Sequence, residues 1–183
     1  MKIIKIFLSL SALTTIVFAD IYADFNKHLK AQEYFAACKD GKSIYLKGEN
    51  NQEILSAIGE VCLKADYIYV LAMIQNRLRT SKDGRNNSVI FSSVVLQKRL
   101  IYQFMYDNVD ISTLALPVIE HPLSYAFVAI RDKAYRVISE TPKIITFDRE
   151  SKNYKVYIDF KAKGRIIIEE YSPNAKTITH RYL

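Results

Sequence analysis

Apolar residues recur at intervals of three and four through much of the first half of the chain, the pattern of helices that bury one face. The clearest example follows residues 48–51, whose composition is typical of a turn. Asn50, three residues before Glu53, predicts a helix start because an asparagine side chain can cap a helix N-terminus. The apolar stripe of this helix consists of Ile54, Leu55, Ile58, Val61 and Cys62.

The same periodicity predicts helices on both sides of this one. A short helix capped by Asp24 is expected first, followed by a helix over residues 32–45. Asp66 is expected to cap a further helix, which ends before a loop at residues 81–87. Residues 88–106 contain neither glycine nor proline, so we expect one longer helix there.

The pattern changes after Pro122. Residues 122–131 fit either a short helix with proline at its first position or a strand. Beyond them, short runs rich in β-branched and aromatic residues alternate with turn-forming segments, which is typical of strands. These runs cover residues 144–147, 154–160, 165–171 and 176–182.

The run at residues 154–160 alternates strictly between apolar and polar positions, which predicts a sheet with one buried face. Short connections favour a four-stranded antiparallel meander, covered by the helix at 88–106 or by the segment after Pro122. The sequence therefore predicts an α+β fold. We expect an N-terminal antiparallel helical-repeat (helix-turn-helix) domain over residues 20–109, followed by a segment over 110–183 that ends in the meander.

The first nineteen residues have the composition of a secretory signal peptide. Lys2 and Lys5 precede an apolar run of about twelve residues, which is short for a membrane-spanning helix of about 20. A small-residue site predicts cleavage between Ala19 and Asp20. The sequence therefore predicts a periplasmic protein, with an extracellular or inner-membrane-anchored protein as the alternatives.

The charge of the chain indicates which partners to expect. The formal net charge is +7, of which the first nineteen residues supply two charges through their lysines. Such a mild excess suits weak contact with anionic lipid or cell-wall polymer, but nucleic-acid binders concentrate basic residues on one face. We expect protein partners in the cell envelope and no nucleic acid. The sequence leaves the oligomeric state open.

The two cysteines predict one disulfide. Cys38 and Cys62 each lie twelve residues from Asn50, so a chain reversal at residues 48–51 would bring them level on two antiparallel helices. In an oxidising compartment two cysteines most simply form a bond. A free thiol pair or a redox site is the alternative, although the spacing is unlike Cys-x-x-Cys.

Residue types that carry chemistry are scattered. His28, His121 and His180 lie on three different predicted elements, and the chain has no His-Glu-x-x-His, phosphate-binding loop or Gly-x-Ser-x-Gly motif. A Cys–His nucleophilic pair remains open, because such partners meet only in three dimensions. We therefore expect no metal, no cofactor and no catalytic residues. A catalytic pocket would bring a histidine to a carboxylate or a cysteine.

A candidate interaction surface combines aromatic and basic residues, since aromatic side chains dominate protein interfaces. An ordinary solvated face is the alternative for the basic group, which Asp83 interrupts. The candidate residues are Tyr67, Tyr69, Arg77, Arg79, Lys82 and Arg85.

An internal repeat links residues 29–32 to residues 63–66, thirty-four positions later. The chain over residues 21–82 resembles tetratricopeptide-type helical repeats, which have this period. The segment from Gln32 through Tyr34 to Ala37 is similar to the turn between the two helices of that family, with glutamine where glycine is usual. The resemblance implies a protein-binding scaffold with no catalytic residues.

These expectations converge on a non-enzymatic periplasmic adaptor or scaffold. It would bind larger envelope machinery for secretion, flagellar motility or cell-wall assembly through its helical-repeat surface. The alternative is an envelope enzyme, or an accessory subunit of one, that acts on cell-wall glycan or peptide.

Overall fold

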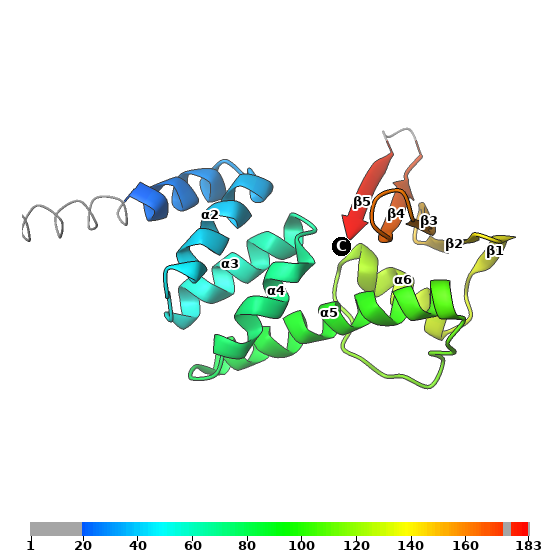
Figure 1. Cartoon of the computed structure of the whole chain (residues 1–183), viewed down its shortest axis with the longest axis horizontal. Helices are drawn as coiled ribbons and strands as arrows, with labels where there is room; N and C mark the ends of the chain where they lie inside the picture. The colour runs from blue at the N-terminus through cyan, green and yellow to red at the C-terminus, as the bar shows by residue number, and fades with distance from the viewer. Residues whose placement is uncertain (1–19, 174–176, 183) are drawn as a thin grey trace, which may run out of the picture.

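A computed structural model describes residues 20–173 and 177–182. The chain folds as predicted into an α+β structure, with helices in the N-terminal part and an antiparallel sheet in the C-terminal part (Figure 1). The predicted signal peptide, up to Ala19, lies outside the described residues. Within them, no helix is both long enough and apolar enough to span a membrane.

The N-terminal part is a succession of helices that pack on their neighbours in the chain. Residues 20–30 form the described part of the first helix. It includes Asp24, so the prediction that Asp24 caps this helix is wrong. The helices that follow are α2 (Tyr34–Leu46), α3 (Gln52–Lys64), α4 (Ile68–Ile74), the 3₁₀ turn η1 (Gln75–Arg77) and α5 (Lys82–Asp107).

The internal repeat of the sequence recurs in the backbone. The first helix and α3 are each followed, two residues after their last helical residue, by a left-handed residue, with φ of 58° at Gln32 and 60° at Asp66. In each turn the next residue, Glu33 or Tyr67, donates its N–H back to a helical carbonyl, at 2.9 and 2.8 Å. This arrangement satisfies carbonyl groups that a helix C-terminus leaves free. Asp66 therefore belongs to the turn that closes α3, and the prediction that it caps α4 is wrong, because Tyr67 holds that position.

Two helix starts also differ from the prediction. Glu49 accepts the N–H groups of Asn50 and Asn51, which moves the cap of α3 from Asn50 to Asn51. Helix α5 begins at Lys82, because Ser81 caps it by accepting the N–H of Gly84. The predicted loop at residues 81–87 is thus largely the first turn and a half of α5.

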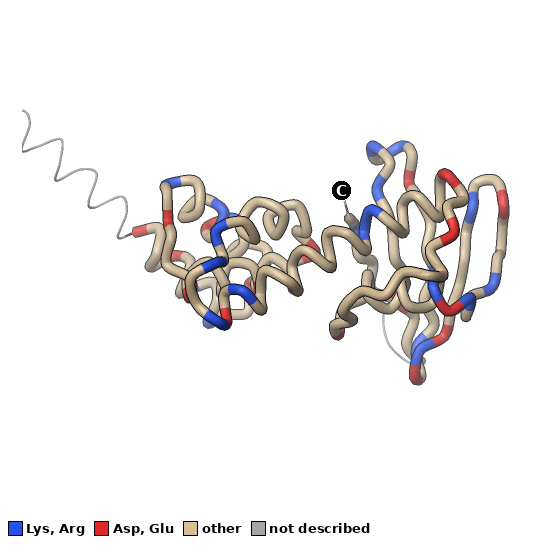
Figure 2. Tube along the Cα trace, turned by 90° about the horizontal axis from the view of Figure 1, so that it is seen from below, with Lys and Arg blue, Asp and Glu red and all other residues tan. Residues whose placement is uncertain are grey.

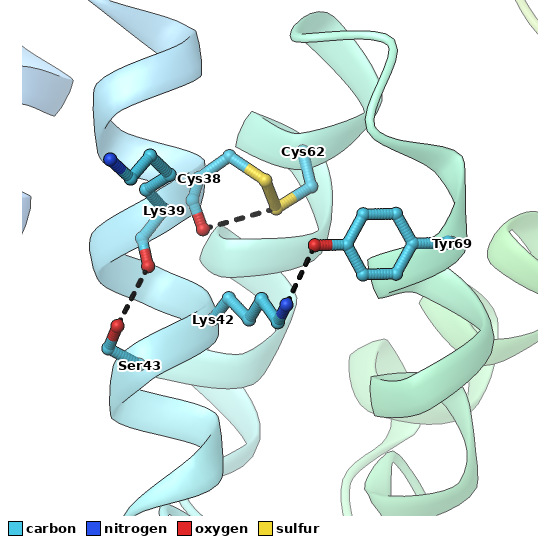
Figure 3. The surroundings of a disulfide bond; sticks show 6 residues. All are labelled: Cys38, Lys39, Lys42, Ser43, Cys62 and Tyr69. Carbon is cyan, nitrogen blue, oxygen red and sulfur yellow. Dashed lines mark hydrogen bonds between the residues drawn. A yellow bond between two sulfur atoms is a disulfide. The ribbon is translucent and has the colours of Figure 1, made fainter. Parts of the chain in front are cut away.

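The disulfide that the cysteine spacing predicts is present. Cys38 of α2 and Cys62 of α3 are both fully buried, with Cα atoms 4.8 Å apart (Figure 3). This distance lies within the range that a disulfide requires. The bond fixes α2 against α3, and no free thiol remains among the described residues.

The ambiguous segment after residue 121 is a helix, α6 (Pro122–Arg131), with His121 as its cap. The sheet follows, and its strands are neighbours in chain order. It has five strands rather than the predicted four: β1 (Arg136–Glu140), β2 (Lys143–Arg149), β3 (Lys152–Asp159), β4 (Arg165–Tyr171) and β5 (Ile178–Tyr182).

The buried face of the sheet packs on both segments that were expected to cover it. Tyr154, Val156 and Ile158 of β3 point inward as predicted, toward α5 and α6. Phe160 does not, because β3 ends at Asp159 and leaves Phe160 exposed. Helix α5 extends from the helical part to the sheet, so both parts share one continuous core (Figure 1).

Candidate binding site

Three segments that are distant in the sequence meet at the carboxylate of Asp66. His180 Nδ1 lies 2.7 Å from one carboxylate oxygen, and His121 Nε2 lies 3.5 Å from the other. The ring of Tyr182 is 5.8 Å from that of His121 and 6.3 Å from that of His180, measured between centroids. These four residues, which we call the Asp66 cluster, join the α3–α4 turn to α6 and to β5.

Backbone geometry fixes each member of the cluster. Asp66 occupies the left-handed position of its turn, which aspartate tolerates better than most residues. His121 Nδ1 accepts the N–H of Leu123, at 3.2 Å, so its hydrogen is carried on Nε2, the atom that faces Asp66. His180 and Tyr182 are two positions apart on β5 and therefore share the inward face of the sheet.

The environment keeps Asp66 ionised. Burial by itself raises the pKa of this carboxyl. Hydrogen bonds from His121 and His180 and the charge of His180 lower the pKa by more than burial raises it, and the net pKa is about 2. Burial, followed by the negative charge of Asp66, raises the pKa of the Tyr182 hydroxyl well above its ordinary value. The carboxylate is therefore a permanent acceptor for the groups that surround it.

The third histidine also pairs with an acid. His28 Nδ1 lies 2.6 Å from a carboxylate oxygen of Asp40 and joins the first helix to α2. All three histidines thus contact carboxylates, as a catalytic pocket would require, but the disulfide leaves neither cysteine free for a Cys–His pair. Within the described residues no group of histidines, cysteines and carboxylates could hold a metal ion.

A hollow of about 450 Å³ lies beside the Asp66 turn, where the helical part faces the sheet. We call it the seam hollow. One wall comes from the helical part and includes Phe35, Tyr67 and Tyr69, while the other comes from β4 and β5 and includes Arg165, Thr179 and Arg181.

The helical wall of the seam hollow is an aromatic cluster. Phe35 meets Tyr67 edge to face, with ring centroids 5.3 Å apart, and Tyr67 meets Tyr69 at 4.9 Å. Lys42 donates to the Tyr69 hydroxyl at 2.8 Å, which fixes that ring (Figure 3). Phe35 is 56% exposed and Tyr69 is 36% exposed. Such ordered and accessible aromatic groups are typical of interface anchors.

The sheet wall of the seam hollow is basic. Arg165 and Arg181 lie on the same face of the sheet, because Arg181 is paired with Ile167, two residues from Arg165. Neither arginine forms an ion pair with a described residue. Elsewhere, basic and acidic positions are interspersed along both parts of the molecule (Figure 2).

The structure separates the residues of the candidate interaction surface. Tyr67 and Tyr69 line the seam hollow, whereas the four basic residues follow at and beyond the other end of α4. Arg77 stacks on the ring of Tyr45 at 4.0 Å and donates to two backbone carbonyls, so it has a structural role. The remaining three are Arg79, Lys82 and Arg85, of which Arg85 donates to the backbone of residues 79 and 80.

Sequence reasoning missed the other residues of the site. Phe35 had a usable signal, because it occupies the position in the first repeat that Tyr69 occupies in the second. Arg165 and Arg181 lie on the outward face of their strands, but alternation does not assign Arg165 to a face, because three consecutive isoleucines follow it. Nothing in the sequence indicates that this face lies next to α4.

Comparisons with known proteins give no further guide. No protein-family model matches the chain, and neither the curated proteins nor the solved structures include a significant match.

Proposed function

We propose that this protein is a non-enzymatic adaptor of the cell envelope that binds another protein through the aromatic wall of the seam hollow. The observation that carries the proposal is the cluster of Phe35, Tyr67 and Tyr69, ordered by mutual ring contacts yet accessible. Aromatic side chains that are already fixed lose little conformational freedom on binding, so they suit an interface.

The framework around the cluster supports the same role. The Cys38–Cys62 disulfide holds α2, which carries Phe35, against α3, and Lys42 links α2 to Tyr69 (Figure 3). The aromatic groups therefore project from a covalently braced scaffold. Structural disulfides are typical of oxidising compartments, which supports the proposed periplasmic location.

A second candidate function, an envelope enzyme or accessory subunit acting on cell-wall glycan or peptide, is favoured by the histidine–carboxylate contacts. We prefer the adaptor because His121 is buried and the Nε2 atoms of His121 and His180 are enclosed. A general base must reach the proton that it removes. In our proposal the Asp66 cluster positions the sheet against the helices.

Site-specific crosslinking in living cells tests the proposal. A photo-reactive phenylalanine analogue is placed at Tyr69, or at Tyr106, an exposed aromatic position on α5, as the matched control. We expect a reproducible envelope protein to crosslink from position 69 and not from position 106. The crosslink should disappear in the Phe35→Ser variant, which removes an edge contact to Tyr67.

Two results would count against the adaptor. Equal crosslinking from both positions would show that the aromatic cluster has no special role. Cleavage of purified cell-wall glycan or peptide that is abolished by His180→Gln, in a protein that still folds, would favour the enzyme. Circular dichroism and thermal unfolding establish whether each variant is folded.

A further inference from the structure

The basic wall of the seam hollow contains two arginines, Arg165 and Arg181, that form no ion pair with a described residue. Arg165 is half-buried, and its Nε atom is enclosed with no hydrogen-bond partner among the residues that the structure describes. Within the same residues, Arg181 donates a single long hydrogen bond, of 3.4 Å, to the carbonyl of Thr179. Enclosing part of a guanidinium without a partner is unfavourable, and its planar fork matches the two oxygens of a carboxylate or a phosphate.

Three carboxylates on the neighbouring segments have other partners. Asp66 accepts from the histidines of its cluster. Asp159, opposite Arg165 in the β3–β4 register, accepts the N–H groups of residues 161 and 162. Glu169 accepts the hydroxyl groups of Tyr157 and Tyr171, at 3.0 and 2.6 Å. The two guanidinium groups are therefore open to a carboxylate from a bound group.

The aromatic wall of the seam hollow indicates which group of the ligand lies beside its carboxylate. Phe35, Tyr67 and Tyr69 offer aromatic surface to an apolar or aromatic side chain, directly across the hollow from the arginines. A polypeptide presents acidic and apolar side chains on opposite sides of one backbone when it is extended. Free phosphate supplies the charge without an apolar group beside it, and the acyl chains of a lipid stay in the bilayer rather than beside the headgroup.

We propose that the seam hollow binds an extended acidic peptide segment of the protein partner, with a carboxylate on Arg165 and Arg181 and an apolar side chain on the aromatic wall. This inference rests on the proposed adaptor function and specifies the chemistry of the partner. The carboxylate is either an acidic side chain or a chain terminus, since both present the same two oxygens to a guanidinium.

Peptide binding to the purified protein tests the inference. The probes are short fluorescein-labelled peptides that alternate glutamate with phenylalanine, or glutamine with phenylalanine, each with an amidated or a free C-terminus. We expect the amidated glutamate peptide to bind, with weaker affinity at higher salt. Binding of the glutamine peptide only when its C-terminus is free would identify a terminal carboxylate as the recognised group. Backbone amide NMR shifts should locate the contact at the seam hollow.

Variants distinguish a specific contribution of the two arginines to peptide binding from a contribution of the overall positive charge. The double variant Arg165→Gln/Arg181→Gln should weaken peptide binding at least about tenfold, because it removes charge-assisted hydrogen bonds. The single variant Arg136→Gln is the control. It removes the same type of charge from β1, at the far edge of the sheet, where Arg136 contacts Asp148 at 2.8 Å. Thermal unfolding shows that each variant is folded.

Several outcomes would overturn the inference. One is peptide binding by the double variant as tight as that by the wild type. Another is equal affinity for the glutamate and glutamine peptides, whether the C-terminus is amidated or free. The third is binding of phosphatidylglycerol vesicles without binding of any peptide. If Tyr69 still crosslinks a partner while the peptides fail, the adaptor stands and only the acidic segment is wrong. If peptides bind while the Tyr69 crosslink is absent, the site stands and the adaptor proposal fails.

Discussion

The two turns of the helical part have the same backbone but different surroundings. Gln32 and Asp66 both adopt a left-handed conformation at the end of a helix, thirty-four residues apart, and three backbone hydrogen bonds of one turn recur in the other. Gln32 is exposed to solvent. Asp66, in contrast, directs its carboxylate to His121 and His180 and so connects the second turn to α6 and β5.

The repeated backbone conformation forms the turn, whereas a single side chain, that of Asp66, attaches the sheet to it. Backbone hydrogen bonding defines the turn, and residues as different as glutamine and aspartate satisfy it. The attachment of the sheet needs a charged acceptor at the second turn only. Both residues stand where the resembled family usually has glycine. Asp66 has an evident reason to be there, whereas nothing in the structure explains Gln32.

The disulfide joins α2 to α3, the two helices that lie between these turns, and removing it should have the largest effect. The Cys38→Ala/Cys62→Ala variant opens a loop of about 25 residues, which predicts a loss of about 3 to 4 kcal/mol in the free energy of unfolding. Chemical denaturation measures this loss. A reductant should lower the stability of the wild type and leave the variant unchanged. Equal stability of the two proteins would mean that the bond does not form.

Removing the side chain at the left-handed position should distinguish the two turns directly. Asp66→Ala leaves His121 and His180 without their shared acceptor and should cost about 3 kcal/mol. Gln32→Ala removes only exposed atoms, so its cost should be about 0.5 kcal/mol or less. Urea unfolding of both variants gives the comparison. Similar losses in the two proteins would show that the Asp66 cluster does not stabilise the seam.

Acid should weaken the second turn selectively. The pKa of Asp66 is about 2 in the folded protein and 3.8 in its ordinary state, a difference that stabilises the ionised fold by about 2 kcal/mol. Because the folded pKa is the lower one, this stability is present above about pH 4 and is lost as the pH falls through 2. The stability difference between the wild type and Asp66→Asn should shrink over that window. The Gln32→Ala variant should follow the wild type.

The sequence predicted the fold class and most elements, because helical periodicity and strand alternation are local properties. Its errors arose where local signals conflicted. Residues 81–87 have the composition of a loop, yet the cap at Ser81 starts a helix there, and Gly84 fits closely against Gln52. Strand β1 was missed because it is an exposed edge strand without alternation.

The candidate site was less predictable, because it depends on contacts between distant segments. Tyr67 and Tyr69 could be proposed from their outward positions, and the repeat would have added Phe35. The hydrogen bond from His180 to Asp66 spans 114 residues. Periodicity cannot detect such a contact, so the role of Asp66 follows only from the three-dimensional position of the sheet beside the second turn.

Glycine at the left-handed positions should change stability in opposite directions at the two turns, and the change at Gln32 should be the smaller one. Gln32→Gly relieves a conformation that costs a residue with a side chain about 1 to 2 kcal/mol. Glycine also gives the unfolded chain more conformational freedom, which lowers the free energy of unfolding by about 0.5 to 1 kcal/mol. The net result should be a gain of about 0.5 kcal/mol. Asp66→Gly gains the same relief and loses the histidine contacts, so it should still be destabilising. Thermal unfolding of the two variants at neutral pH measures both signs, and stabilisation by both would mean that each turn is defined by its backbone alone.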